Sequence, residues 1–357
     1  MIQTIDLRGR RLNHAELLDI VPRATTDVSV ATDAASALIA DVRARGGLAL
    51  LEQAERFDGV RPDHVRVQTS AIADAVSRLE PAVRDALEEA IARVRRASEA
   101  QVPAPSVTTL GHGAEVSQRW SPIARVGLYV PGGKAVYPSS VVMNVVPAQV
   151  AGVASIALAS PPQKDFGGAI HPTILGAAGL LGVDEVYAMG GAGAIGALAY
   201  GVPDLDLAPV QLVTGPGNVF VAAAKRLVRG QVGIDSEAGP TEILVIADAA
   251  ADPLLVAVDL ISQAEHDELA AAVLVTDSAL FADRVRSELE RVVPSARHSD
   301  RVRAALTGAQ SAVVLVDDLS AAAAFSNVYG PEHLEIQTGD PSAILDLIHN
   351  AGAIFLG

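Results

Sequence analysis

Gln263 and His266 are a pair of residues that could together hold a metal ion. They are three residues apart near the end of an expected helix, so their side chains face the same side of it. This spacing suits two ligands on one ion, although a surface histidine is the more common explanation of such a pair. Glutamine is also an unusual zinc ligand, so the spacing alone does not establish a zinc site.

Glu332 and His333 are the second pair that could do chemistry. They follow Gly330-Pro331 and precede the apolar run LEI, which places them where a loop enters an expected strand. A carboxylate beside an imidazole suits general acid/base catalysis, because the imidazole can exchange a proton near neutral pH. A solvated pair in a loop is the simpler alternative.

Three glycine-rich segments lie between expected strands and helices. Residues 191–196 (GAGAIG) fit G-x-G-x-x-G, whose backbone can approach a pyrophosphate at a helix amino terminus. No acidic residue ends the following strand, however, and helix packing accounts for these glycines equally well. Residues 215–218 (GPGN) suit either close approach of a ligand or a tight turn. Lys134, in PGGK, could contact a phosphate or could simply be solvated.

Composition limits the classes of protein to which this chain can belong. Of its 357 residues 50% are apolar but only 3% are aromatic, so its cores must be built from Ala, Val, Leu and Ile. Such cores suit parallel strands covered by alanine-rich helices. The net charge of -15 argues against nucleic acid or an anionic membrane as a partner. The absence of cysteine excludes disulfides, cysteine-ligated metals and catalysis by a thiolate.

Neither targeting nor membrane insertion is indicated by the apolar segments. The amino-terminal residues MIQTIDLRGRRLN lack the apolar run of a secretory signal. The most apolar stretch, 141–160, is interrupted by Asn144, Pro147 and Gln149, so it does not read as a membrane span. We therefore expect a cytoplasmic protein.

Apolar periodicity predicts an α/β fold. Amphipathic helices are expected over 33–56 and 69–100, followed by an extended or loop segment over 101–125. From residue 126 onward, short apolar runs alternate with helical patterns, which is the order of βα units in a parallel sheet. We predict two Rossmann-like, doubly wound domains. Residues 126–240 would form one, and 241–357 would form the other together with 1–125, whose helices would pack on it.

Five stretches, in this order, resemble the histidinol dehydrogenase family. They are RVGLYVPGGKAVYPSSVVMNVVPAQVAGV (125–153), VTGPGNVFVAAAKR (213–226), IDSEAGPTEILVIAD (234–248), DLISQAEHD (259–267) and GPEHLEIQT (330–338). The resemblance extends from the amino terminus to residue 357, and it favours the chemical explanation of the polar pairs. It implies a homodimer that oxidises L-histidinol to L-histidine through L-histidinal, with zinc and two NAD. The absence of cysteine agrees with an aldehyde that is hydrated by water.

The resemblance also implies roles for residues of the substrate site. Gln263 and His266 match two zinc ligands that also contact the substrate, whose amine and imidazole the zinc would hold. His333 matches a substrate-contacting base that takes protons during both oxidations. Glu332 matches the residue that activates water, and Thr241 matches a hydroxyl that contacts the substrate.

Tyr129, Gly193 and Asn218 match the NAD-contacting positions of the family. Position 193 is usually a glutamine within GGAQAI, so this chain lacks that side-chain contact. The change to glycine also creates the G-x-G-x-x-G pattern, which weakens its value as a nucleotide fingerprint.

Family members continue beyond GAIFLG (352–357) with a segment that carries an Asp and a His of the zinc site and reaches across the dimer. We therefore expect the family's small C-terminal domain to be missing and the zinc site to be incomplete. The chain halts at the carboxyl end of a strand, the edge where α/β enzymes place their sites. Two alternatives are a truncated, inactive homologue and a related NAD-dependent dehydrogenase of another polyol or amino alcohol.

Overall fold

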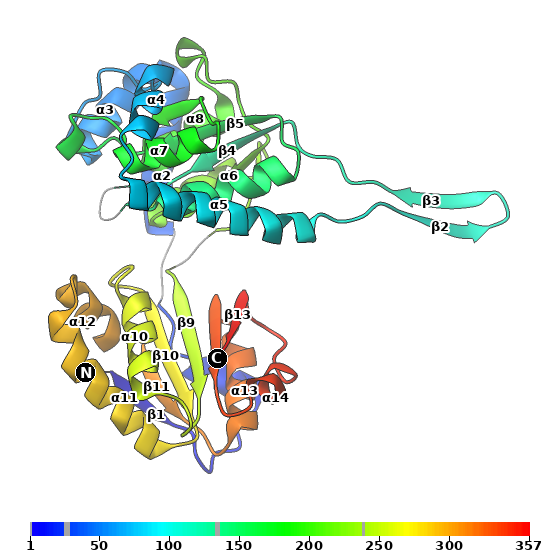
Figure 1. Ribbon diagram of the computed structural model, residues 1–357, viewed down its shortest axis with the longest axis vertical. Helices are drawn as coiled ribbons and strands as arrows, with labels where there is room; N and C mark the ends of the chain where they lie inside the picture. The colour runs from blue at the N-terminus through cyan, green and yellow to red at the C-terminus, as the bar shows by residue number, and fades with distance from the viewer. Residues whose placement is uncertain (1, 25–28, 133–135, 238–239) are drawn as a thin grey trace. The chain divides into compact units, whose positions relative to one another are not determined.

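The computed structural model describes residues 2–24, 29–132, 136–237 and 240–357, and the chain divides into two compact units. Unit 1 comprises Met1–Thr26 and Gly239–Gly357, and unit 2 comprises Asp27–Ala238. Each unit is built around a parallel sheet with helices packed against it (Figure 1). This confirms the predicted α/β class with parallel sheets.

The sheet of unit 2 has five parallel strands in the order β6-β5-β4-β7-β8. They are β4 (Arg125–Tyr129), β5 (Ser155–Ser160), β6 (Val186–Ala188), β7 (Leu212–Thr214) and β8 (Gly233–Ile234). The chain begins at the central strand β4, adds β5 and β6 on one side, and then returns to add β7 on the other. In open α/β sheets, ligands bind at the carboxyl ends of the strands where this order reverses. In unit 2 those strands are β4 and β7.

The helices that follow the strands of unit 2 are α6 (Pro138–Val150), α7 (Pro172–Leu180), α8 (Gly191–Tyr200) and α9 (Val219–Val228). In α8 every residue from 192 to 199 is buried, and α7 has a buried run as well. A helix that is apolar on all sides must be covered on its outer surface as well as on the surface that faces the sheet. Unit 2 therefore needs a further layer of helices.

The amino-terminal helices of unit 2 provide this layer. They are α2 (Ser29–Arg45), α3 (Gly47–Phe57), α4 (Thr69–Ser77) and α5 (Pro81–Gln101). Helix α2 packs on α8 and α9, α4 packs on α7, and α5 packs on α6 (Figure 1). Our prediction that residues before 126 pack on the other domain is therefore wrong for 27–125. Amphipathic spacing shows that a helix has an apolar face, but it does not show which surface that face covers.

Strands β2 (Ser106–Gly111) and β3 (Ala114–Gln118) form an antiparallel hairpin that follows α5. All of their residues are exposed, and Figure 1 shows the hairpin extending away from the end of α5. Sequence analysis predicted an extended or loop conformation here, because prolines and glycines interrupt the apolar pattern. The structure shows a regular strand pair between the interruptions.

The sheet of unit 1 has six parallel strands in the order β1-β11-β10-β9-β12-β13. They are β1 (Gln3–Asp6), β9 (Glu242–Ala247), β10 (Ala271–Thr276), β11 (Ala312–Leu315), β12 (His333–Gln337) and β13 (Ala353–Leu356). The sheet is built as in unit 2: β9 is central, β10 and β11 lie on one side, and β12 and β13 lie on the other. The amino-terminal strand β1 extends it beyond β11.

Strand β9 contributes to a hydrophobic core on each face of this sheet. Val245 packs with Leu260 and Phe281 under α10 (Pro253–Ala264), α11 (Ala279–Val292) and α12 (Ser299–Thr307). Leu244 packs in the opposite core, on the side of α13 (Leu319–Tyr329), with α14 (Pro341–Leu345) and α1 (His14–Ile20). Each buried Val, Leu or Phe stabilises the fold by about 1.5–3 kcal/mol. The site described below is thus carried by a central, rigid strand.

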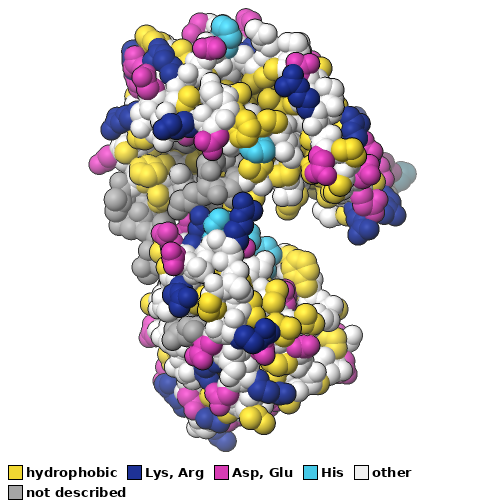
Figure 2. Space-filling model, turned by 60° about the vertical axis from the view of Figure 1, so that its left-hand side comes forward, with side chains coloured by type: hydrophobic (Ala, Val, Ile, Leu, Met, Phe, Trp, Pro, Cys, Tyr) yellow, Lys and Arg dark blue, Asp and Glu magenta, His cyan; other side chains and the backbone are white. Residues whose placement is uncertain are grey.

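Charges of both signs are interspersed on the face shown in Figure 2, without a continuous basic patch. This distribution agrees with the acidic composition of the chain. Among the described residues, none of the helices has the length and apolar character needed to cross a membrane.

Candidate active site

Three of the predicted site residues form a hydrogen-bonded chain at the amino ends of β9 and β12. Gln263 Nε2 donates to Thr241 Oγ1 at 2.6 Å, and the Thr241 hydroxyl donates to Glu332 Oε2 at 2.8 Å. The backbone N–H of Glu242 donates to the same carboxylate oxygen at 3.2 Å. Parallel pairing of β12 with β9 places Glu332 beside Thr241, although 91 residues separate them. The Glu332 carboxylate is therefore held in one orientation by two donors.

The His333 imidazole lies next to this chain and is also oriented. Its Nδ1 lies 3.0 Å from the Glu242 carbonyl oxygen, which can only accept a hydrogen bond, so Nδ1 carries the proton. In the neutral ring Nε2 is then a proton acceptor. The ring also stacks on Phe355 of β13, with 6.4 Å between centroids, and Nδ1 is 3.8 Å from Glu332 Oε2. The pair predicted from sequence is therefore a fixed carboxylate beside a fixed base.

Gln263 and His266 lie at the carboxyl end of α10. Gln263 is buried, and its Nε2 is used by Thr241, which leaves Oε1 as a possible ligand atom. His266 follows the helix, and its Nδ1 lies 2.9 Å from the Ser262 carbonyl oxygen, which leaves Nε2 as the ligand nitrogen. The carboxyl end of a helix also favours a cation. These donors fit two positions of a zinc ion, and the described residues contain no group of three His, Cys, Asp or Glu that could hold a metal.

The position of this site in unit 1 differs from the edge that we associated with α/β sites. Glu332 precedes β12 and Thr241 precedes β9, so the site is at the amino ends of the strands. The carboxyl ends of β9 and β12 are instead joined by a hydrogen bond from Gly339 N to Asp248 Oδ2, 2.9 Å long.

The side chains that surround Glu242 were not predicted from the sequence. Arg23 Nη1 lies 3.6 Å from Glu242 Oε1, and the Arg23 guanidinium lies 4.8 Å from the centroid of the Tyr329 ring. Burial raises the pKa of Glu242, although Arg23 opposes this shift and the neighbouring Glu332 adds to it. Arg23 is more than 200 residues away in sequence, on a segment without a motif, so no sequence signal could have found this contact.

In unit 2, Tyr129 and the loop 215–218 lie together where the strand order reverses. Gly215 follows β7 with φ of +117°, and a Cβ there would be 1.9 Å from the Tyr129 carbonyl oxygen. Only glycine permits this approach. Asn218 caps α9, because its side chain accepts hydrogen bonds from Phe220 N at 3.1 Å and Val221 N at 3.2 Å. The amide NH₂ of Asn218 is a donor suited to phosphate, and the positive end of the α9 dipole favours an anion there.

The Tyr129 side chain ties β4 to the beginning of α8. Its hydroxyl accepts a hydrogen bond from Gly191 N at 3.1 Å, and the residue is 4% exposed. Burial raises the pKa of Tyr129 to about 12; the hydrogen bond from Gly191 opposes this shift and the Asp58 carboxylate adds to it. The hydroxyl therefore stays protonated. Burial also raises the pKa of Asp58 to about 6. Lys134, the third nucleotide-side candidate, lies outside the described residues.

Gly193 lies on α8, two residues beyond Gly191, and its environment explains the glycine by packing. A Cβ at Gly193 would be 2.0 Å from Gln53 Oε1, and a Cβ at Gly196 would be 3.1 Å from the Ile39 side chain. Gln53 is buried on α3, and its Nε2 donates to the Leu38 carbonyl oxygen at 3.2 Å. The lack of a side chain at both glycines therefore allows α3 and α2 to pack closely on α8. This agrees with helix packing as the reason for the glycines.

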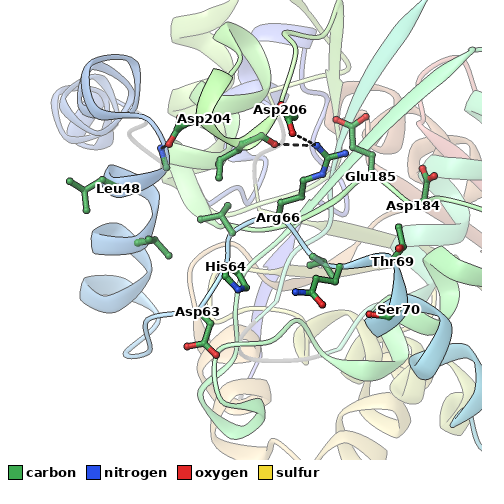
Figure 3. Close-up of a pocket in the computed structure, with 16 residues that line it drawn as sticks. Leu48, Asp63, His64, Arg66, Thr69, Ser70, Asp184, Glu185, Asp204 and Asp206 are labelled. Carbon is green, nitrogen blue, oxygen red and sulfur yellow. Dashed lines mark hydrogen bonds and ion pairs between the residues drawn. The ribbon is translucent and has the colours of Figure 1, made fainter.

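Unit 2 also contains an open pocket of about 890 Å³, drawn in Figure 3, that none of the predicted site residues lines. Its five carboxylates are Asp63, Asp184, Glu185, Asp204 and Asp206. The Arg66 guanidinium lies 3.4 Å from Asp206 Oδ2 and points toward it in the figure. A lining with more carboxylates than cations repels a pyrophosphate, so the pocket does not suit NAD.

Comparisons with known proteins identify the family. The family model described as histidinol dehydrogenase matches residues 21–357. A histidinol dehydrogenase from Leifsonia xyli subsp. xyli is 69% identical over 356 residues, which cover 100% of this chain and 82% of that protein. The chain belongs to the histidinol dehydrogenase family. It is therefore an oxidoreductase with a place in histidine biosynthesis.

Two further relatives support the assignment. A histidinol dehydrogenase from Thermobifida fusca is 56% identical over 357 residues, covering 100% of this chain and 80% of that protein. The crystal structure of histidinol dehydrogenase from Elizabethkingia anophelis matches with a TM-score of 0.92 at 30% identity, covering 100% of this chain and 80% of that one. The fold predicted from sequence is thus the fold of this family.

We predict that Gly193→Ala destabilises the protein. Glycine-to-alanine changes inside helices usually add about 1 kcal/mol of stability. Here the methyl group would overlap the buried Gln53 amide, and overpacking costs about 1–3 kcal/mol. We therefore expect the free energy of unfolding in urea to fall, and to recover when Gln53→Ala is added. A single Gly193→Ala variant more stable than the wild type would show that Gln53 moves aside without cost.

Proposed function

We propose that this oxidoreductase converts L-histidinol to L-histidine through L-histidinal, with two NAD⁺ as hydride acceptors. One observation carries the proposal: an imidazole with a free acceptor nitrogen lies beside a carboxylate that two donors hold in place. This pair matches the two tasks of the reaction, which are removal of an alcohol proton and addition of water to an aldehyde. The identity with relatives called histidinol dehydrogenase supports the same substrate.

His333 would act as the base in the first oxidation. Its Nε2 takes the hydroxyl proton of L-histidinol while a hydride leaves the same carbon for NAD⁺, and the C–O bond becomes the carbonyl of L-histidinal. The hydrogen bond from Nδ1 to the Glu242 carbonyl keeps the ring in the tautomer that this step needs and stabilises the charged imidazolium that forms.

Glu332 would activate water in the second half of the reaction. Thr241 and Glu242 both donate to Oε2, which leaves Oε1 to take a proton from the water as its oxygen adds to the aldehyde carbon. The His333 imidazolium returns its proton to the carbonyl oxygen, which gives the neutral hydrate. His333 then takes a proton from the hydrate as the second hydride leaves for NAD⁺, and the carboxylic acid that forms loses its own proton. Overall, alcohol and water lose two hydrides and three protons to give the carboxylate.

We further propose that Gln263 Oε1 and His266 Nε2 supply two of the ligands of a zinc ion. When bound there, zinc would hold the substrate's amine and imidazole and so orient its carbinol carbon. Gln263 is hydrogen-bonded to Thr241, and His266 is hydrogen-bonded to the Ser262 carbonyl oxygen. These bonds orient both ligand atoms in the absence of the ion. Thr241 thereby links the ligand Gln263 to the water-activating Glu332.

NAD would bind at the carboxyl ends of β4 and β7, near Tyr129 and Asn218. NAD⁺ supplies the hydride-accepting nicotinamide, and this chain supplies the donors of Asn218 and of the α9 amino terminus. Gly193 can offer only its backbone, because it has no side chain and Gln53 fills the space beside it. The sequence resemblance also supports a homodimer, and the biosynthetic role supports a cytoplasmic location.

The test is formation of NADH from L-histidinol and NAD⁺, followed at 340 nm with product analysis, with added zinc and with a chelator. We expect two NADH per L-histidine and loss of turnover when the chelator is present. The histidinol dehydrogenase of Leifsonia xyli is the positive control. Turnover that resists the chelator would contradict the zinc proposal. No turnover with saturating zinc would favour an inactive homologue, and activity only toward other amino alcohols or polyols would favour a related dehydrogenase.

A further inference from the structure

Lys225 is a buried cation in unit 2 whose position the proposed reaction does not explain. It lies on α9, and its side chain is only 2% exposed. Its ammonium group is 2.6 Å from Asp235 Oδ1 and also donates to the carbonyl oxygen of Gly215. Burying a lysine is costly unless all of its charge is compensated. The chain therefore places a buried ammonium, bonded to Asp235 and to the Gly215 carbonyl oxygen, beside the loop 215–218.

Asp235 completes a clamp around the backbone of Gly215. Its Oδ2 accepts a hydrogen bond from Gly215 N at 2.8 Å, while its Oδ1 accepts one from Ser236 N at 2.7 Å. The N–H of Gly215 is thus bonded to Asp235, and the C=O of Gly215 is bonded to Lys225. Both polar groups of one peptide position are fixed by two charged side chains that are themselves paired.

Gly215 is the position at which this loop has the least freedom. Its φ of +117° and its contact with the Tyr129 carbonyl oxygen leave no room for a Cβ. A rotation of this residue would therefore shift Pro216 to Asn218 relative to Tyr129. Such a shift would also move the Asn218 side chain and the α9 amino terminus that it caps.

A buried ammonium paired with a carboxylate whose side chain is 34% exposed is an unusual choice for a purely structural role. Replacing such a pair with apolar residues of similar size is often neutral or stabilising, because desolvation of the charges offsets their attraction. Apolar residues, however, could not form hydrogen bonds with the N–H and the C=O of Gly215. We propose that Lys225 and Asp235 are positioning residues that hold the loop 215–218 in the conformation that binds the dinucleotide. This inference rests on the proposed NAD site.

The test compares Lys225→Met with the double variant Lys225→Met/Asp235→Leu. The single variant removes the donor to the Gly215 carbonyl oxygen and leaves Asp235, whose side chain is 34% exposed, without its partner, so we expect losses of both stability to urea and NAD⁺ affinity. The double variant removes both charges, so stability should recover while the loop stays unclamped. Misplacement of a binding group by about 1 Å can cost on the order of 100-fold, and we expect NAD⁺ affinity by calorimetry to be about 10- to 100-fold lower.

Three further measurements distinguish a positioning role of Lys225 and Asp235 from a purely structural role. The KM for NAD⁺ should rise, while the KM for L-histidinol and the kcat at saturating NAD⁺ stay near wild-type values. Hydrogen exchange of the peptide covering 214–221 should become faster in the double variant, while that of β4 and β5 stays unchanged. The exposed pair Arg93–Glu89, replaced as Arg93→Met/Glu89→Leu, is the control for loss of an ion pair and should change none of these.

The outcomes distinguish this inference from the proposed function. A stable double variant with wild-type NAD⁺ affinity and wild-type exchange in the loop would overturn the positioning role. A wild-type protein that binds no NAD⁺ would instead contradict the NAD site itself. If the double variant does not fold, Lys225→Met alone provides the test, because it removes the donor to the Gly215 carbonyl oxygen and leaves a carboxylate that is 34% exposed. Unchanged NAD⁺ affinity and loop exchange in that variant would also overturn the role.

Discussion

Replacing His333 with alanine is expected to lower kcat by about 10²–10⁴-fold in both oxidations, which is the usual contribution of a positioned acid or base. In the proposed mechanism, Nε2 of this ring takes the proton in each hydride transfer, and the hydrogen bond of Nδ1 to the Glu242 carbonyl leaves Nε2 as the acceptor. Both half-reactions should therefore suffer together. The measurement is steady-state NADH formation with L-histidinol and, separately, with L-histidinal as the substrate.

The matched control for this variant is His349→Ala, because His349 is an exposed histidine of the same unit. It should keep wild-type rates, and both variants should keep wild-type stability to urea. The defect of His333→Ala should also shrink as the pH rises, since hydroxide can replace a missing base. An unchanged rate in His333→Ala would remove this residue from the mechanism.

The residues of the proposed substrate site could be named from sequence, but their arrangement could not. Glu332 and His333 are adjacent, and Gln263 precedes His266 by three residues, so each pair was visible as a pair. The two pairs meet through Thr241, because β9 and β12 pair in one particular register. Strand register depends on packing across the whole sheet. The bond that orients His333 is therefore invisible in sequence, since its acceptor is a backbone carbonyl 91 residues away.

The strands of the two sheets also differ in how well they can be predicted from sequence. Runs such as EILVIA and AAVLVT predict β9 and β10 directly, because both strands are buried on two faces and are apolar throughout. Strand β1 (Gln3–Asp6) and strand β8 (Gly233–Ile234) are short edge strands, so their sequences carry no apolar run that would reveal them. The amphipathic helices were found, but their partners in unit 2 were not, because many alanine-rich surfaces can accept an apolar helix face.

Strand topology also decides between the two glycine-rich segments. By pattern, residues 191–196 fit a nucleotide fingerprint as well as helix packing, and residues 215–218 fit either close approach of a ligand or a tight turn. The structure places 191–196 after the edge strand β6 and 215–218 after β7, beside the central strand β4. Only the second location is a point where the strand order reverses. Whether a glycine-rich loop can bind a ligand therefore depends on the position of the preceding strand in the sheet. That position is set by the folded sheet and is not visible in the motif itself.

Replacing Glu332 with glutamine is expected to separate the two oxidations. The amide keeps an oxygen that can accept from Thr241 and Glu242, so the site should keep its shape. It cannot take a proton from water, so we expect oxidation of L-histidinal to fall by about 10²-fold or more. Oxidation of L-histidinol needs only the His333 base and should change much less. The measurement is the rate with each substrate, with detection of L-histidinal released from L-histidinol.

The control for Glu332→Gln is Glu290→Gln, an exposed glutamate on α11 of the same unit, which should leave both rates unchanged. Thr241→Val adds a graded test, because it removes the hydroxyl that donates to Glu332 but keeps the carboxylate. Its effect should also be larger on the second oxidation, and smaller than that of Glu332→Gln. Equal losses in both half-reactions of Glu332→Gln would mean that the carboxylate acts in binding or in orienting His333, because a role confined to water activation cannot slow a step that uses no water.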